Sequence, residues 1–289
     1  MKYQIFSEIL NKNIFEKAKS DLLEKIVQQP YWYIGLFRPA KPKAKILQNI
    51  LQSNEIRFGG CLEKIFELYF IELGFEVLPK KITFKGKNLD IDQLFKHDNT
   101  VYFIEHKVRD DHDSSKKRGQ HENFESKVEA LGNIYGQKNL KCFVYFTDEN
   151  FIKNKNYYDE VMKTITNKYK IEAYLWYGKE WWTQLGHKEV WDEILIYLKK
   201  WKEEIPDLPV VNFDENPKST FEEIKDIKAP IIRKLFDNKE ICKEILPVIF
   251  QTNDTLKLLI EYNKTHEPKM DIYIYLAKSI SLYIKSTIK

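Results

Sequence analysis

The stretch from residue 89 to residue 108 constrains the fold most strongly. Two apolar runs, residues 89–95 and 100–108, are separated by the polar residues 96–99. Apolar runs of this length around a short polar turn predict the two strands of a β-hairpin. Because side chains alternate between the two faces of a strand, Glu105 and Lys107 project from the same face. Asp92, near the start of the first strand, can approach Glu105 from the neighbouring strand.

The rest of the chain changes period at Gly74. Apolar residues recur at helical spacing before this glycine, over residues 6–28 and 54–73. After it, the pattern predicts further strands at 75–78, 140–147 and 171–177 and helices at 121–135, 157–169, 179–185 and 190–204. This order predicts an α/β (α+β) fold, in which a mixed central β-sheet is flanked by helices and carries helical N- and C-terminal additions.

Three prolines, at positions 206, 209 and 217, indicate a linker. We therefore expect one domain over residues 1–205, with an N-terminal helical extension, and a C-terminal helical region over residues 206–289. A capping box, formed by Ser219 with Glu222 or by Thr220 with Glu223, is expected to begin the first C-terminal helix.

The composition permits a nucleic-acid partner without requiring one. The chain has 289 residues, and its 47 Lys and Arg exceed its 43 Asp and Glu by only four charges. A nucleic-acid-binding protein of this composition has to segregate a basic face from an acidic site. The three cysteines lie in apolar surroundings far apart, which predicts reduced thiols. With no signal-peptide pattern and no membrane-spanning stretch, we expect a cytoplasmic protein without membrane contact.

Two carboxylates this close repel each other, and a divalent cation relieves the repulsion. Mg²⁺ prefers oxygen ligands and keeps several of its waters, so Asp92, Glu105 and the backbone carbonyl of His106 form a candidate metal site. Lys107 is then placed to orient an attacking water or to stabilise developing negative charge. Asp90, two residues before Asp92, competes for the same role. The alternative is a solvated Glu-Lys pair on an exposed strand.

The spacing of Asp92 from Glu105-His106-Lys107 on an apolar strand resembles the PD-(D/E)xK nuclease superfamily. The resemblance extends over about residues 55–177 and includes Glu63, at the place of a metal-associated glutamate on the preceding helix. Ile91 stands where the family name has proline. The resemblance implies a restriction-endonuclease-like core, Mg²⁺ as cofactor, and Asp92, Glu105, Lys107 and Glu63 as catalytic residues.

The polar segment after the catalytic strand is similar to that of type II restriction endonucleases. Its side chains have the chemistry of phosphate and base-edge contacts, and the DNA-binding candidates are Lys116, Lys117, Arg118, Gln120, His121 and Asn123. A solvated loop is the alternative. A second basic patch consists of Arg38, Lys41, Lys43 and Lys45.

Two further groups have ordinary explanations. His106 and His112, with Asp110, Asp111 and Asp113, lack the defined ligand spacing of a transition-metal site. His106 is expected to be packed on the face opposite Glu105. The aromatic residues Trp176, Tyr177, Trp181, Trp182 and Trp191 are expected to pack in the core rather than stack on bases.

The leading hypothesis is a Mg²⁺-dependent type II restriction endonuclease that cleaves double-stranded DNA at a short specific sequence. The resemblance implies a homodimer, whose two-fold axis matches that of its site, and a companion DNA methyltransferase. The C-terminal region would then serve recognition or dimerisation. The alternatives are a structure-selective repair or junction nuclease and a non-catalytic DNA-binding module with a nuclease-like fold.

Overall fold

The computed structural model describes residues 1–110, 114–265 and 271–287. The chain folds into two compact units. Unit 1 consists of Met1–Ile9 and Gly59–Glu204, and unit 2 consists of Leu10–Phe58 and Ile205–Lys289. Helices α1 (Tyr3–Ile14) and α4 (Pro42–Glu72) each contribute residues to both units.

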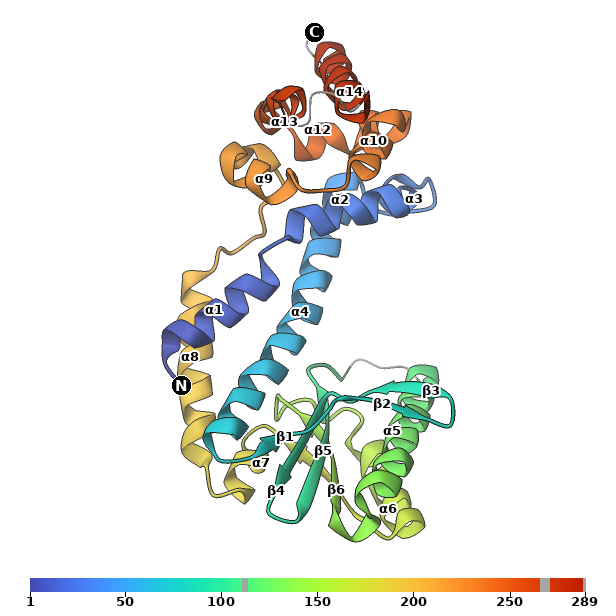
Figure 1. Cartoon of the computed structure of the whole chain (residues 1–289), viewed down its shortest axis with the longest axis vertical. Coiled ribbons are helices and arrows are strands. Elements are labelled where there is room, and N and C mark those ends of the chain that lie inside the picture. Colours follow the sequence, from blue (N-terminus) through green and yellow to red (C-terminus); the bar gives the residue numbers. More distant parts are fainter. Residues whose placement is uncertain (111–113, 266–270, 288–289) are drawn as a thin grey trace. The chain divides into compact units, whose positions relative to one another are not determined.

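A five-stranded mixed sheet forms the centre of unit 1, with the strand order β1-β4-β5-β6-β7 (Figure 1). The strands are β1 (Glu76–Val77), β4 (Gln93–His97), β5 (Thr100–Lys107), β6 (Leu140–Phe146) and β7 (Glu172–Tyr177). The pairs β1–β4 and β4–β5 are antiparallel, whereas β5–β6 and β6–β7 are parallel. The predicted mixed sheet and its hairpin are therefore confirmed, with the hairpin turn at Asp98 and Asn99.

The expected single strand over residues 89–95 is instead divided between two sheets. β3 (Lys87–Asp90) pairs with β2 (Lys81–Phe84), whereas β4 begins at Gln93 and pairs with β5. The N–H of Ile91 donates to the carbonyl of Lys80 at 2.7 Å, which ends the β2–β3 ladder. The chain then bends at Asp92 before it enters the main sheet, so Asp92 precedes β4.

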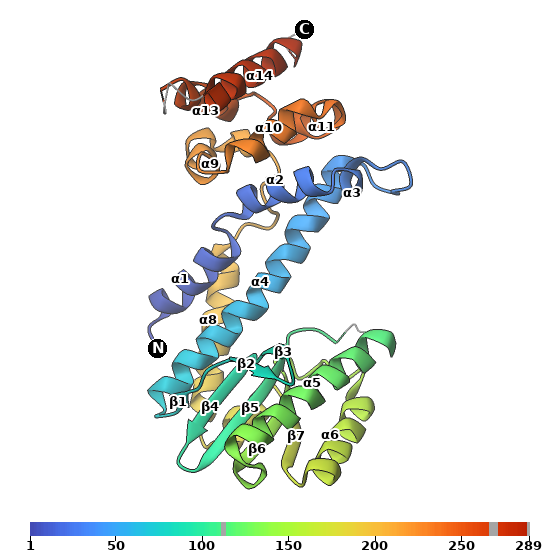
Figure 2. The same ribbon diagram turned by 45° about the vertical axis from the view of Figure 1, so that its right-hand side comes forward.

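Helices cover both faces of the main sheet. Figure 2 shows α5 (Ser114–Tyr135) and α6 (Lys155–Tyr169) lying side by side on one face. On this face Phe103 of β5 stacks on Phe124 of α5, with ring centroids 5.1 Å apart. On the other face Phe95 packs against Phe70 of α4, and Phe143 packs against Trp181 of α7 (Lys179–Gln184). α8 (Lys188–Glu204) follows α7 and packs against it.

Three of the expected helices have other boundaries in the structure. The helix expected over residues 54–73 begins at Pro42, as α4. The helix expected to begin at residue 121 begins at Ser114, so residues 114–119 are helical rather than a loop. The helix expected over residues 6–28 is two helices, α1 and α2 (Ala18–Gln28). Lys17 separates them with a left-handed backbone, at φ +61°.

Unit 2 is helical throughout its described part. Its elements include α2, α3 (Tyr31–Ile34), the first part of α4, α9 (Pro217–Ile224), α10 (Ala229–Asp237), α11 (Lys239–Glu244), α12 (Leu246–Ile249), α13 (Asp254–Thr265) and α14 (Asp271–Thr287). Their apolar faces form one core, in which Leu23, Leu235 and Ile280 are almost fully buried. The expected capping box is not what begins α9: the side chain of Asn216 accepts from the N–H of Ser219, and Thr220 is buried.

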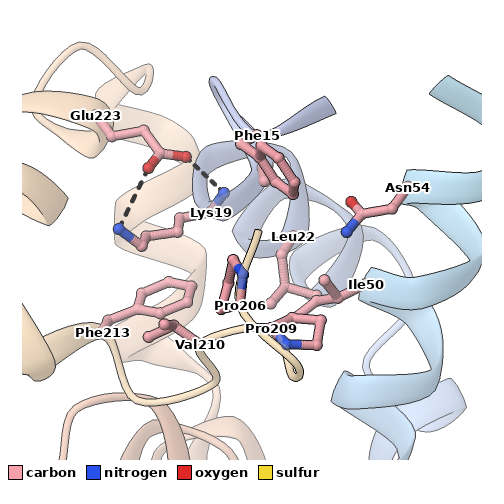
Figure 3. A pocket seen from close by; sticks show the side chains of 11 residues that line it. Phe15, Lys19, Leu22, Ile50, Asn54, Pro206, Pro209, Val210, Phe213 and Glu223 are labelled. Carbon is pink, nitrogen blue, oxygen red and sulfur yellow. Dashed lines mark hydrogen bonds and ion pairs between the residues drawn. The ribbon is translucent and has the colours of Figure 1, made fainter. Parts of the chain in front are cut away.

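Unit 2 also has an apolar pocket of about 220 Å³ between α2, α4 and the segment that follows α8 (Figure 3). The rings of Phe15 and Phe213 and the side chain of Leu22 line it. Glu223 closes one side, where it accepts from the backbone N–H of Lys19 at 2.6 Å and pairs with the ammonium of the same lysine.

The three cysteines are free thiols, as predicted, and two of them, Cys61 and Cys142, are buried. Across the described residues, the structure contains no helix with the length and apolar character needed to cross a membrane.

Candidate active site

Strand β5 carries the first two residues of the site. Glu105 and Lys107 are two residues apart and project from the same face, toward α5. The ammonium of Lys107 lies 2.7 Å from Oε1 of Glu105, and their side chains are only 13% and 12% exposed. The parallel pairing of β5 with β6 holds this part of the strand, since Glu105 lies opposite Val144 and Lys107 opposite Phe146. The predicted geometry of the Glu-x-Lys pair is therefore present.

Asp92 reaches the site from the bend that precedes β4. Its Oδ2 atom accepts a hydrogen bond from the backbone N–H of His106 at 3.0 Å. Next to it, the side chain of Gln93 donates to the backbone carbonyl of Glu63 at 2.7 Å, which ties β4 to α4. The bond from His106 thus holds Asp92 near the end of β5, and the bond from Gln93 holds the backbone of Glu63 near β4. Asp90 is exposed at the end of β3, in the other sheet.

A third element, α5, supplies a residue that the sequence interpretation missed. The ammonium of Lys127 lies 2.7 Å from Oε2 of Glu105 and 3.5 Å from Oδ1 of Asp92, and its side chain is 5% exposed. A signal was present in the sequence, because Lys127 shares a helix face with the apolar residues Phe124 and Leu131. A lysine on a buried helix face requires a charged partner, since an unpaired buried charge is costly.

The electrostatics of the cluster differ from residue to residue. Burial raises the pKa of Asp92, and the nearby Glu105 carboxylate raises it further. Burial also opposes ionisation of Glu105, but Lys107 and Lys127 outweigh it and hold the pKa of Glu105 below its ordinary value. Burial acts to lower the pKa of Lys127, yet Glu105 and Asp92 outweigh this and raise it. Lys127 is therefore a buried cation that compensates two carboxylates.

Glu63 lies on α4 beside this cluster and is half-buried. Burial, followed by the charge of Asp92, raises the pKa of Glu63 to about 7, although Lys80 opposes the shift. A third carboxylate next to two others is thus poised to hold a proton near neutral pH.

His106 lies on the opposite face of β5, as predicted. Its ring stacks on Tyr145, and its Nε2 atom lies 2.6 Å from the hydroxyl oxygen of Thr147. Burial lowers the pKa of His106 to about 3, so the ring is neutral. The side chain is a core residue, and only its backbone remains a candidate for the site.

The chemistry of the donor set fits a hard divalent cation. Asp92 and Glu105 offer carboxylate oxygens, the ligand type that Mg²⁺ prefers. Lys127 contacts both of them, so a positive charge already bridges the two carboxylates. Among the described residues, no group of three His, Cys, Asp or Glu side chains is arranged as a ready metal site. A cation would therefore have to take over contacts that Lys127 and Lys107 now make.

The six candidate DNA contacts fall on the first turns of α5. Arg118 and Asn123 are exposed. Lys117 donates to the side chain of Asn154 at 2.8 Å, and Gln120 accepts from the hydroxyl of Tyr158 at 3.0 Å. His121 lies 3.9 Å from Glu125. The side chain of Lys116 is outside the described part of the structure.

The aromatic residues and the acidic residues near 110 that the sequence singled out have structural roles where the structure describes them. Trp181 and Trp182 are almost fully buried, and Tyr177 and Trp191 are buried, so they pack in the core as predicted. Residues 111–113, which include His112, lie outside the described residues. Asp110 is buried and accepts from the backbone N–H and the side chain of Asn154, at 2.9 Å and 2.5 Å.

A mixed sheet with helices on both faces, and with an acidic and lysine-containing cluster at the end of its hairpin, has the restriction-endonuclease-like fold that the sequence predicts. Residues 70–202 match the family model described as type II restriction endonuclease, HinfI. The match extends from α4 into α8 and confirms the resemblance to PD-(D/E)xK type II restriction endonucleases, which are nucleases that act on DNA. No curated protein and no solved structure matches the chain.

Proposed function

We propose that this protein is a Mg²⁺-dependent type II restriction endonuclease, which cleaves double-stranded DNA at a short specific sequence by phosphodiester hydrolysis. The observation that carries the proposal is the buried cluster of Asp92, Glu105 and Lys107, inside the segment that matches the HinfI family. A protein that only bound DNA would gain nothing from two carboxylates placed to face a phosphate, because they would repel it.

Asp92, Glu105 and the backbone carbonyl of His106 are the proposed ligands of the metal ion. When bound, Mg²⁺ supplies positive charge to the scissile phosphate and lowers the pKa of a coordinated water. The bond from the N–H of His106 to Asp92 fixes this carboxylate before a metal arrives. Prior fixing of ligands reduces the entropy that is lost on binding.

Lys107 is the proposed catalytic lysine. Its side chain is 13% exposed, and its ammonium lies 2.7 Å from Oε1 of Glu105. From there it orients the attacking water or stabilises the negative charge that develops on the phosphate. Glu63, whose pKa is about 7, is the proposed proton carrier beside the site, since it can hold or release a proton at neutral pH.

Lys127 is a proposed positioning residue. It keeps Asp92 and Glu105 together while no metal neutralises them. When bound between these carboxylates, Mg²⁺ would supply the positive charge that Lys127 supplies in its absence. This role explains why a lysine occupies a helix face that otherwise packs on the sheet.

The DNA contacts proposed for this domain lie at the start of α5. Arg118 and Asn123 are exposed there and have the donors that read guanine and adenine. Lys116, Lys117, Gln120 and His121 belong to the same turns. We assign unit 1 to the nuclease activity. We assign recognition or dimerisation to unit 2, in which residues 206–289 pack with Leu10–Phe58 rather than forming a separate region as the sequence suggested. A homodimer would match a palindromic site, and a companion methyltransferase would protect the host DNA.

The proposal is tested with purified protein and unmethylated phage-sized DNA, incubated with Mg²⁺ and separately with EDTA. Discrete Mg²⁺-dependent fragments are expected. Fragments that form only from branched DNA would instead support the junction nuclease. Binding without cleavage, with or without metal, would leave the non-catalytic binding module.

A further inference from the structure

An unusually exposed apolar pair lies in unit 2, between α3 and α4. The side chains of Leu36 and Phe37 are 91% and 98% exposed. Before them, Tyr31 and Trp32 are also exposed, whereas Tyr33 is buried in the core of unit 2. Isolated apolar residues are common on surfaces, but four such residues within seven positions mark a contact surface.

The backbone presents this pair in a defined turn. The N–H of Gly35 donates to the carbonyl of Tyr31, and the N–H of Arg38 donates to the carbonyl of Gly35, both at 3.0 Å. A Cβ atom at Gly35 would lie 2.5 Å from the carbonyl oxygen of Tyr31, so glycine is required here. Pro39 then restricts the chain behind the tip. Figure 2 shows the segment between α3 and α4 as an open loop.

The charge around this tip is positive. From residue 25 to residue 54 the sequence contains no Asp or Glu. Arg38, Lys41 and Lys43 are exposed, and Lys45 follows one turn into α4, where it donates to Gln48 at 2.8 Å. The first turn of α4 therefore has no acidic residue to balance its dipole, which favours an anion there.

Two acidic residues of α11 line the hollow beside the tip. A hollow beside the tip is lined by Tyr31, Phe37 and Arg38 and, from α11, by Glu240 and Glu244. Glu244 pairs with Lys243 at 3.5 Å. Because these glutamates repel an anion, an anionic partner would contact the exposed tip and the start of α4 rather than the interior of the hollow.

We propose that Leu36 and Phe37 form a wedge that inserts between base pairs of a DNA duplex, while Arg38, Lys41 and Lys43 bind the flanking phosphates. The inference rests on the proposed function, which supplies DNA as the partner. Apolar side chains that unstack a base step, flanked by basic residues, are a general way to kink DNA. A second copy of the chain is less suited to the surface, since it would bring an equally basic loop against this one.

The test compares Phe37→Ala with Leu282→Ala, a control in unit 2 whose side chain is 67% exposed on α14. The probe is a duplex with the sequence that the wild type cuts, with 2-aminopurine at successive positions of one strand. Affinity is measured by anisotropy in Ca²⁺, and unstacking is read from the 2-aminopurine fluorescence. Circular dichroism and urea unfolding show that each variant is folded.

We expect wild type and Leu282→Ala to brighten 2-aminopurine at one step. Phe37→Ala should lose this signal and bind about 10-fold or more weakly, because stacking on one base is worth that much. In the double variant Lys41→Gln/Lys43→Gln, the slope of log K against log salt concentration should become shallower by about 2, because two phosphate contacts are lost. Unchanged affinity and unchanged fluorescence in Phe37→Ala would overturn the wedge.

The outcome separates this proposal from the proposed function. If wild type cuts DNA and Phe37→Ala unstacks it equally well, the wedge is wrong and the nuclease stands. If wild type neither binds nor cuts DNA, both are wrong.

Discussion

The ammonium of Lys127 lies 2.7 Å from Oε2 of Glu105, on a side chain that is 5% exposed. Lys127 lies on α5, 22 residues after Glu105 in the sequence, and it contacts Asp92 as well. Lys127 therefore contacts both of the carboxylates that we propose as ligands of Mg²⁺. Competition between the lysine and the metal follows from this arrangement.

Lys127→Met should destabilise the metal-free protein by about 3 kcal/mol, because two buried carboxylates lose their bridge. Mg²⁺ should then stabilise the variant more than it stabilises the wild type, since the metal replaces a missing charge instead of displacing a lysine. Urea unfolding in EDTA and in Mg²⁺ measures both effects. Lys163→Met, at an exposed position on α6, is the control and should change stability by less than about 0.5 kcal/mol. Equal stabilisation of wild type and Lys127→Met by Mg²⁺ would argue against the competition.

Asp92→Ala should reduce Mg²⁺-supported cleavage by about 100-fold or more, because a ligand of the metal is lost. Asp90→Ala should cleave at close to the wild-type rate, since Asp90 is exposed at the end of β3. Initial rates on one DNA substrate, with Mg²⁺ varied, compare the two. The reverse result would move the metal ligand two residues along the chain.

Glu63→Gln should change how stability depends on pH. The pKa of Glu63 is raised to about 7 in the folded protein, so the folded state binds the proton more tightly than the unfolded state. Stability therefore falls as pH rises from the unfolded value of 4.5 through about 7. Between about pH 5 and pH 8, the wild type should lose about 1 to 3 kcal/mol relative to Glu63→Gln in EDTA. Parallel stability curves for the two proteins would show that Glu63 ionises normally.

Sequence-based predictions were confirmed where a single local pattern determines the structure. The β4–β5 hairpin and the common face of Glu105 and Lys107 follow from alternation within a few residues. The burial of His106 follows from the same alternation. The match to the HinfI family extends over this segment.

The parts that were missed depend on distant contacts or on unusual backbone. Lys127 joins the cluster only because α5 packs across the sheet. The break at Lys17 requires a positive φ that lysine rarely adopts, so nothing in its sequence marks it. Residues 89 and 90 leave the expected strand and join β3, because residues 81–84 offer a second partner. The sequence does not predict that Phe37 is exposed, because a phenylalanine is usually buried and the exposure depends on the surrounding fold.

Lys107→Ala, compared with wild type on unmethylated phage-sized DNA in Mg²⁺, tests the central claim most directly. DNA binding of both proteins is measured in parallel in Ca²⁺. The account predicts discrete fragments with wild type, a loss of cleavage of about 100-fold or more in the variant, and equal DNA binding by both. Cleavage by Lys107→Ala at the wild-type rate would contradict the assignment of this site, as would a wild-type protein that binds such DNA and never cuts it.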